Sequence, residues 1–322
     1  MSNSSQVIIL TDRKDAHVPY VQCHLTGDCV IIDPQELASG LPLSIAATSN
    51  GTVVVTYNGI ELTNVTGIWQ RKPQPVGQLP VPAELQVYSA SAIERLYSML
   101  LVAFPSATRV SDYYAGLRAS NKLLQLEQAR RLGFNTPDTI FTNSPAAAGA
   151  FLAEHPKSIT KRLSRTVPRF NGRQALFMTT EVDDSFMPNL ANLHLAPAIF
   201  QTAIEPKHDI RVTVVGDQTF AAYVKSGTVS HSVPIRDSRV GSSIGKISIT
   251  EASDLPPKIA EQCVALVKAL GLNFGAIDLI QDKSDVYWFI ENNVGGQWAY
   301  IEEATALQIG RAIAELLEGG ES

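Results

Sequence analysis

The chain has 322 residues, of which 45% are hydrophobic and 18% are charged, and its formal net charge at pH 7 is −5. These fractions are typical of a globular protein with room for two or three packed lobes. The mild negative charge argues against nucleic acid or an anionic membrane as a partner. No apolar stretch approaches the roughly 20 residues of a membrane span.

The N-terminal residues and the number of cysteines bear on the cellular compartment of the protein. Residues 1–5 lack the basic and apolar regions of a signal peptide. The chain has three cysteines, Cys23, Cys29 and Cys263, and such a small odd number fits a reducing environment. Cys29 lies in an apolar run, which favours core packing over metal binding. We therefore expect a cytoplasmic protein.

Residues 1–117 are predicted to form an N-terminal α/β domain. Three short apolar runs have the composition of buried strands: Val7–Leu10, Cys29–Ile32 and Gly67–Gln70. A polar loop and a short amphipathic segment separate the first two runs, which predicts parallel strands around a crossover. Residues 52–62 are divided by Asn58-Gly59, a pair typical of a hairpin turn. A core helix is expected over about 89–104.

Residues 118–197 are predicted to form a central lobe. The lobe opens with residues 119–125, and a helix is expected to run from there to Arg131, with Gly133 as its C-terminal cap. A short strand at 158–162 then opens a segment with six basic residues and no acidic one: Lys157, Lys161, Arg162, Arg165, Arg169 and Arg173. A solvated loop is one interpretation, but a single sign of charge favours an anionic partner, either ATP or an acidic peptide.

Residues 198–322 are predicted to form a C-terminal lobe. A hairpin is expected over 210–224, a helix over 257–270 and a last helix over about 302–317. The polar stretch at 226–245 is interpreted as a substrate-facing loop. The mixed, partly antiparallel pattern differs from a single doubly wound sheet.

Oxygen-bearing side chains occur in two apolar strands of this lobe. Asp278 lies in the first strand, and Glu291 and Asn293 lie in the second, with a polar turn between the strands. Glu291 and Asn293 share a face because side chains alternate along a strand, and a hairpin would bring Asp278 near them. Two carboxylates and an amide oxygen suit Mg²⁺. The alternative, solvated surface carboxylates, is disfavoured because the strands are strongly apolar.

These pieces together resemble the ATP-grasp superfamily over nearly the whole chain. The resemblance is sharpest to the RimK-like peptide maturases that build graspetides such as the microviridins. Four segments carry it: Ile68–Pro73, Ser120–Leu124, Asp209–Gly216, and Gly296–Trp298 with Ile301–Glu303. The resemblance implies an α/β (α+β) ATP-grasp fold, in which an N-terminal pre-ATP-grasp domain precedes two lobes that clasp ATP. One departure is Val294-Gly295, where the family usually has Pro-Asn, which puts the rigidity of this loop in doubt.

The resemblance also implies roles for individual residues. Lys122 and Lys161 match the lysines that reach the nucleotide phosphates, and Arg211 matches the arginine that steadies the transferred phosphate. The expected Mg²⁺ ligands are Asp278, Glu291 and Asn293. The nucleotide base and ribose are assigned to the segment between the lobes, which comprises Gln201, Thr202, Ala203, Ile204 and Glu205. Candidates for substrate binding are Arg71, Arg165, Arg169, Arg173, His208, Asp209 and Arg239.

The function implied is an ATP-dependent ligase that joins Asp or Glu side chains of a ribosomal precursor peptide to Ser, Thr or Lys. One alternative is a RimK-like ligase that adds a free amino acid to a peptide or protein. Another is a silent protein that only binds ATP or a peptide. A homodimer is expected, because relatives of this type are often dimers.

Overall fold

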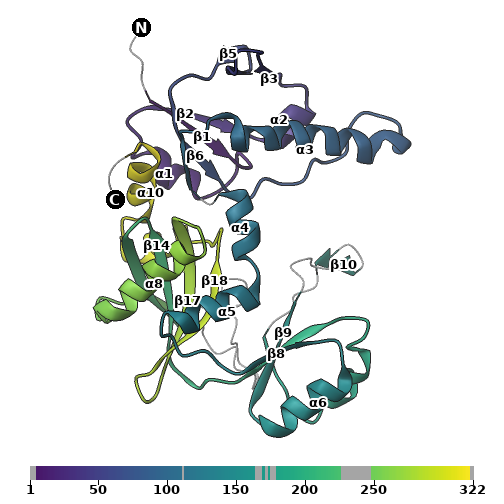
Figure 1. Cartoon of the computed structure of the whole chain (residues 1–322), viewed down its shortest axis with the longest axis vertical. Coiled ribbons are helices and arrows are strands. Elements are labelled where there is room, and N and C mark those ends of the chain that lie inside the picture. The colour runs from purple at the N-terminus through teal and green to yellow at the C-terminus, as the bar shows by residue number, and fades with distance from the viewer. Residues whose placement is uncertain are drawn as a thin grey trace.

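The computed structural model describes residues 5–110, 112–163, 169–170, 173–174, 179–225 and 248–319. Figure 1 shows its arrangement, with the N-terminal domain next to the C-terminal lobe and the central lobe at the far end. Within the described residues, no helix is long and apolar enough to cross a membrane.

The N-terminal domain is built on a four-stranded parallel sheet in the order β2-β1-β6-β7. The strands are β1 (Gln6–Leu10), β2 (Asp28–Ile32), β6 (Val65–Gln70) and β7 (Thr108–Val110). The helices are α1 (Val18–Gln22), α2 (Pro34–Ala38), η1 (Ala83–Leu85) and α3 (Gln86–Ala103). The parallel unit predicted from the apolar runs is confirmed.

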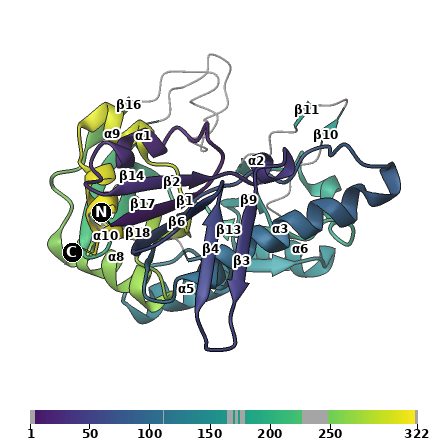
Figure 2. The same cartoon turned by 90° about the horizontal axis from the view of Figure 1, so that it is seen from above.

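A small antiparallel sheet projects from this domain (Figure 2). It consists of β3 (Leu43–Ala47), β4 (Val53–Tyr57) and β5 (Ile60–Glu61). The predicted hairpin is β4–β5, and Asn58 and Gly59 adopt the positive φ angles that its turn needs. Strand β3 was not predicted.

The central lobe has an antiparallel sheet in the order β12-β9-β13-β8. Its strands are β8 (Thr139–Thr142), β9 (Ser158–Arg162), β12 (Thr180–Glu181) and β13 (Ala198–Thr202), and α6 (Pro145–Glu154) and η2 (Met187–Asn192) pack with them. Two further short strands, β10 (Arg169–Phe170) and β11 (Arg173–Gln174), pair with each other. The boundary expected at 197/198 lies instead after Thr202, because β13 pairs with both β8 and β9.

The C-terminal lobe has a five-stranded antiparallel sheet in the order β16-β15-β14-β17-β18. Its strands are β14 (Pro206–Val215), β15 (Gln218–Lys225), β16 (Ser248–Glu251), β17 (Phe274–Asp282) and β18 (Tyr287–Asn293). Helix α8 (Pro257–Ala269) covers one face, as expected. Helices α4 (Tyr113–Ala119) and α5 (Lys122–Arg131) contribute to the same core. The expectation that α5 belongs to the central lobe is therefore corrected, because its apolar residues Leu126 and Ala129 pack in the core of the C-terminal lobe.

The other face of this sheet joins the N-terminal domain. Its core combines Phe274 and Val215 with Ile9, Trp69 and residues of α9 (Ala299–Thr305) and α10 (Ile309–Leu317). The last helix expected over 302–317 is two helices, because Ala306 adopts a left-handed φ of 60° and ends α9. Helix α10 fits closely against β6, where a Cβ on Gly67 would lie 2.4 Å from the Leu317 carbonyl oxygen. The two ends of the chain therefore share one core.

Candidate active site

Three neighbouring strands place polar side chains on one face of the C-terminal sheet. Arg211 on β14 pairs with Asp278 on β17, and Asp278 pairs in turn with Glu291 on β18. Residues directly opposite each other on neighbouring strands project to the same face. Asn293 lies on that face too, two residues after Glu291. The proximity of Asp278 to Glu291 and Asn293, predicted from the sequence, is thus found in the structure.

Hydrogen bonds connect these side chains into one network. Arg211 Nε donates to Asp278 Oδ1 at 2.6 Å. Asn293 Nδ2 donates to Asp278 Oδ2 at 3.0 Å and to Glu291 Oε1 at 2.9 Å. Lys122 Nζ donates to Glu291 Oε2 at 2.5 Å. The side chains of Asp278 and Glu291 keep 30% and 31% of their surface exposed, so a ligand can reach both carboxylates.

The position of Lys122 is set by the way α5 is fixed to β18. Asn121 caps the helix, and its side chain accepts a hydrogen bond from the Leu124 N–H. Gln125, which is 1% exposed, donates from Nε2 to the Asn292 carbonyl oxygen at 2.8 Å and accepts from the Asn292 N–H at 3.1 Å. This pair of bonds holds the first turn of the helix beside Glu291. Sequence reasoning missed Gln125, although its i, i+3 spacing from Lys122 places both on one side of the helix.

The surroundings drive the pKa values of the two carboxyl groups apart. Burial, helped by the charge of Glu291, raises the pKa of Asp278 to about 6, although the Arg211 guanidinium opposes the shift. Burial also acts to raise the pKa of Glu291, but the charges of Lys122 and Lys161 outweigh it and lower that pKa. Such a divergence between neighbouring carboxyl groups is typical of functional sites.

The chemistry of this donor set fits Mg²⁺. Among the described residues, no group of three or more His, Cys, Asp and Glu side chains is arranged to hold a metal ion. Mg²⁺ does not need such a cage, because it is usually held by one or two carboxylates together with water and substrate phosphates. Asp278 and Glu291 supply two carboxylates, bridged through the amide of Asn293, whose oxygen is a third donor of the same kind.

The central lobe contributes Lys161. Its Nζ donates to Gln201 Oε1 at 2.9 Å, and Gln201 Nε2 donates to Thr139 Oγ1 at 2.9 Å. Lys161 also lies near enough to the C-terminal sheet for its charge to act on Glu291. The two predicted lysines, Lys122 and Lys161, therefore act on the same carboxylate from different lobes.

The segment between these lobes borders a pocket of about 250 Å³. Its lining residues are Ala203, Ile204, Glu205, Asp282, Lys283, Ser284 and Trp288. Within the segment, the Thr202 N–H donates to the Asp138 carbonyl oxygen at 3.0 Å and the Ala203 N–H to the Lys157 carbonyl oxygen at 2.8 Å. Glu205 accepts a hydrogen bond from Lys283 Nζ at 2.7 Å. Three of the residues expected to contact the nucleotide thus line a pocket.

Two of the predicted substrate-binding residues, Arg71 and His208, have their side chains engaged with other parts of the chain. The Arg71 side chain is only 1% exposed and donates from Nε to Asp15 Oδ2 at 3.2 Å, so its charge is used inside the chain. His208 lies three residues before Arg211 and therefore faces the opposite side of β14. Its ring packs against Tyr223, with the centroids 4.5 Å apart. The candidacy of His208 for substrate binding at this site is corrected on this ground.

The other substrate-binding candidates lie on strand β14, on the short strands β10 and β11, or outside the described residues. Asp209 is exposed and shares the strand face of Arg211. Arg169 and Arg173 lie in β10 and β11, of which the structure describes only the backbone. Arg165 and Arg239 lie outside the described residues.

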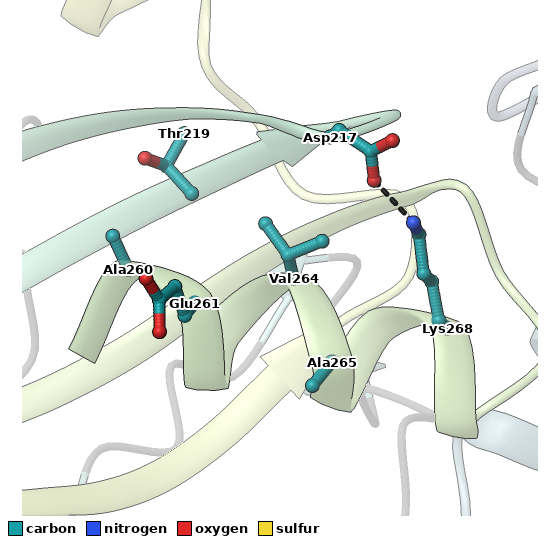
Figure 3. Close-up of a pocket in the computed structure, with 7 residues that line it drawn as sticks. All are labelled: Asp217, Thr219, Ala260, Glu261, Val264, Ala265 and Lys268. Atoms are coloured by element: carbon teal, nitrogen blue, oxygen red, sulfur yellow. Dashed lines mark ion pairs between the residues drawn. The ribbon is translucent and has the colours of Figure 1, made fainter. Parts of the chain in front are cut away.

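A pocket of about 370 Å³ lies elsewhere, between α8 and the β14–β15 turn (Figure 3). Asp217 and Lys268 form an ion pair at one end of it, as the dashed line shows. Thr219 pairs with Val214, whose side chain packs in the core under α8, so this pocket is on the face opposite to Arg211. It is not part of the network around Asp278.

Comparison with known proteins finds a similar curated protein and similar solved structures. No protein-family model matches the chain. A curated relative, the probable alpha-L-glutamate ligase 1 of Shewanella oneidensis, is 23% identical over 272 residues, covering 82% of this chain and 80% of that protein.

Among solved structures, a RiPP-associated ATP-grasp ligase of Chryseobacterium gregarium, in complex with ADP and a leader and core peptide, matches with a TM-score of 0.85. It is 23% identical, and the match covers 97% of this chain and 96% of that one. The macrocyclase MdnC of Microcystis aeruginosa, bound with precursor peptide MdnA, matches with a TM-score of 0.80 and 26% identity over 97% and 98% of the two chains.

A third structure, ATP-grasp ligase PsnB complexed with a minimal precursor, Mg and ADP, has a TM-score of 0.72 and 17% identity over 97% and 96% of the chains. These matches confirm the expected resemblance. The chain has the ATP-grasp fold, in a form that is similar over nearly its whole length to ATP-grasp ligases solved with precursor, leader or core peptides.

Proposed function

We propose that the chain is an ATP-dependent ligase that forms side-chain ester or amide crosslinks in a ribosomal precursor peptide of the microviridin type. One observation carries this proposal: the network from Lys122 through Glu291, Asn293 and Asp278 to Arg211, built on one face of an ATP-grasp sheet. The similar structures that hold ADP and a peptide support it. The reaction takes place in the cytoplasm, where ATP and newly made peptide are both present.

The reaction has two balanced steps. A carboxylate oxygen of an Asp or Glu side chain in the peptide attacks the γ-phosphorus of ATP, which yields an acyl-phosphate and releases ADP. A hydroxyl or amine of a second side chain then attacks the acyl carbon, and phosphate leaves while the nucleophile loses its proton. Each crosslink therefore removes one water from the peptide and converts one ATP to ADP and phosphate.

The protein positions the reactants and neutralises charge, as in other phosphoryl transfers. Asp278, Glu291 and Asn293 would hold Mg²⁺, which would supply positive charge against the phosphates. Lys122 and Lys161 are released from their present partners to contact the nucleotide phosphates, because an ammonium is a compact point charge suited to phosphate. Arg211 steadies the transferred phosphoryl group and the acyl-phosphate.

The nucleotide base and ribose occupy the segment from Gln201 to Glu205. Ala203, Ile204 and Glu205 support this assignment by lining the pocket opposite the β17–β18 turn. The backbone of this segment is held by bonds to residues 138 and 157, so it presents a fixed edge to a planar base.

The acidic core of the peptide is expected to meet basic residues of the central lobe and of the polar stretch at 226–245. Arg165, Arg169 and Arg173 fall in the acid-free segment at 157–173, and Arg239 falls in the polar stretch at 226–245. These assignments, and that of Asp209, are predictions from the sequence.

A second candidate function is the addition of a free amino acid to a peptide or protein. The observation that favours it is the similarity to a probable glutamate ligase over 82% of this chain. Activation of a carboxylate by ATP is the same in both reactions, and only the origin of the nucleophile differs.

Intact mass separates these functions. The chain is co-expressed with each short reading frame beside its gene, and each peptide is weighed with wild type and with Glu291→Gln. Loss of one or more waters that requires wild-type enzyme is the expected result. A gain of amino-acid residues instead would establish the second function, and an unchanged mass with every peptide would leave only a binding role.

We further propose that the protein is a homodimer that pairs through α3. An exposed stripe follows the 3,4 spacing of a helix–helix seam at Leu85, Tyr88, Ala92, Arg95, Met99 and Val102. Tyr88, Met99 and Val102 are 73%, 50% and 62% exposed, whereas Tyr97, Leu100 and Leu101 face the core of the domain. Helix α3 extends past the edge of its sheet, so the stripe is open to a second copy (Figure 1).

Negative charges introduced into this stripe are expected to repel each other across the interface and to produce monomers. The double variant Met99→Glu with Val102→Glu places four carboxylates in the paired seam, and light scattering after size-exclusion chromatography measures the mass. Ser91→Glu, on the same helix but outside the stripe, serves as the control. A dimer that persists in the double variant, or a monomeric wild type, would contradict the α3 interface.

A further inference from the structure

A buried polar cluster lies where the N-terminal domain meets the C-terminal lobe. Strand β1 has β2 on one side and β6 on the other, so the loops after β1 and β6 leave the same sheet edge at the point where the strand order reverses. The first loop leads to Asp15 and His17, and the second begins with Arg71. His17 and Arg71 are 6% and 7% exposed. Polar groups this deeply buried need defined partners.

Asp15 holds the cluster together. Its Oδ1 lies 2.8 Å from His17 Nδ1, and its Oδ2 accepts from Arg71 Nε at 3.2 Å and from Thr11 Oγ1 at 3.0 Å. Arg71 also lies over the Trp69 ring, 5.3 Å from its centroid. The acceptors of Asp15 are thus all directed at neighbours in its own domain.

His17 and Arg71 also form hydrogen bonds with the backbone of residues 296–298, just after Asn293. His17 Nε2 accepts from the Trp298 backbone N–H at 3.2 Å, and Arg71 Nη1 donates to the Gly296 carbonyl oxygen at 3.4 Å. Because Nε2 is an acceptor, the proton of a neutral His17 must be on Nδ1, where it is donated to Asp15. The cluster therefore presents one acceptor and one donor to the backbone of residues 296–298.

That backbone lies against the candidate active site. The Gly296 N–H donates to the Asn293 carbonyl oxygen at 3.1 Å, which closes a turn directly after Asn293. A Cβ on Gly296 would lie 2.3 Å from the Ala276 Cβ and 3.4 Å from Arg211 Nη1. Gly296 therefore packs closely on the sheet beside Arg211. A shift of residues 296–298 would change the room available to the Arg211 guanidinium.

We propose that Asp15, His17 and Arg71 are positioning residues of the ATP-grasp site, acting through the backbone of Gly296 and Trp298. They fix residues 296–298 from the side of the N-terminal domain. Arg211 and Asn293 keep their geometry because residues 296–298 cannot shift. The assignment rests on the proposed function, because it takes the Arg211 network as the reacting site.

Packing of the Trp298 ring alone does not account for this arrangement. The ring lies against Trp69, Tyr20 and His17, with centroids 6.5, 6.1 and 5.2 Å away. Such contacts anchor the side chain but leave the backbone N–H and the neighbouring carbonyl without partners. Only an acceptor at the position of Nε2 gives the backbone N–H of Trp298 its partner.

The experiment compares two conservative variants of the full-length protein. His17→Gln extends an amide to the position of Nε2 and can accept from Trp298, whereas His17→Asn reaches only the position of Nδ1 and keeps the contact with Asp15. Hydrogen exchange of the peptide that contains residues 295–299, read by mass spectrometry, reports the Trp298 amide directly. Single-turnover crosslinking of the precursor peptide and the affinity for Mg²⁺ and ADP are measured on the same samples.

The expected result is a separation of the two variants. In His17→Asn, exchange at 295–299 becomes at least about tenfold faster and the crosslinking rate falls about 10- to 100-fold, while the affinity for ADP changes by less than about threefold. His17→Gln keeps slow exchange and most of the rate. Arg71→Lys, which retains the charge near Asp15 but loses the fork that reaches Gly296, behaves like His17→Asn.

Two outcomes would overturn the assignment. The first is wild-type exchange and rate in both His17→Asn and Arg71→Lys. The second is an equal loss in His17→Gln and His17→Asn with a matching fall in melting temperature, which would make the cluster a stability element alone. If wild type forms no product, the proposed function fails, while the exchange of residues 295–299 still decides whether the cluster holds the segment.

Discussion

Asp278→Asn and Glu291→Gln are each expected to lower ATP turnover by at least about 10²- to 10³-fold, the range seen when one charge-stabilising group is removed from a reacting centre. Each replacement keeps the size of the side chain and its capacity to accept a hydrogen bond, but removes a negative oxygen that Mg²⁺ requires. Binding of Mg²⁺ with ADP should weaken in parallel, because the proposed ligands and the phosphates share the ion. Calorimetry and phosphate release measure the two effects.

A matched control is available on the same sheet. Asp217→Asn also removes one carboxylate, but from the pocket on the opposite face, where its partner is Lys268. Turnover in this variant should stay within about twofold of wild type, as for surface changes in general. Normal turnover in both Asp278→Asn and Glu291→Gln would show that the metal assignment is wrong.

The pKa of Asp278 adds a pH dependence to this prediction. Below its pKa of about 6 in the free protein, Asp278 is protonated and a proton competes with Mg²⁺ for the site. Glu291, whose pKa is lowered, stays ionised over the same range. Affinity for Mg²⁺ with ADP should therefore be constant above about pH 7 and fall by up to about tenfold per pH unit below 6. Titrations between pH 5 and 8 test this, and an unchanged affinity at pH 5 would contradict it.

Replacing Arg211 is expected to affect the chemical step more than binding. Arg211→Ala removes the guanidinium beside Asp278 and should lower the single-turnover rate by about 10²- to 10³-fold, while the affinity for ADP falls less than about tenfold. Arg211→Lys keeps a charge but loses the planar fork that reaches Asp278 through Nε, so it should recover only part of the rate. A loss confined to nucleotide affinity would contradict the role of Arg211 in phosphoryl transfer.

The pH profile of Arg211→Ala gives an independent check. The guanidinium lowers the pKa of Asp278, so its removal should move the acid limb of Mg²⁺ binding upward from about pH 6. Arg211→Lys should leave the limb closer to its original position. A limb that does not move would mean that Arg211 and Asp278 are not electrostatically coupled in solution.

The proximity of Asp278, Glu291 and Asn293 could be predicted from the sequence because the argument needed only local rules. Alternation placed Glu291 and Asn293 on one face, and the short turn after β17 forced Asp278 to pair beside them. The same rule of alternation would have placed His208 on the face opposite to Arg211, since three residues separate them. That candidate was therefore avoidable from the sequence alone.

Other features depend on contacts that no local pattern reveals. Arg71 is neutralised by Asp15, 56 residues earlier, and a run of Arg-Lys-Pro gives no sign of that burial. The sequence of helix α5 does not say which sheet it packs on, which the bonds between Gln125 and Asn292 and the packing of Leu126 and Ala129 show. The break at Ala306 lacks the Gly or Pro that usually marks a helix end.

The shared core of the chain ends affects how this protein can be divided or recombined. Helix α10 lies against α1 and β6, and its last residues pack on Gly67 with no room for a side chain. A fragment that ends before Ile309 would leave Val7, Ile9 and Trp69 without the surface that covers them. If the N-terminal domain is exchanged between related enzymes, helix α10 therefore has to be exchanged with it. These two parts of the chain are far apart in the sequence but form one structural unit.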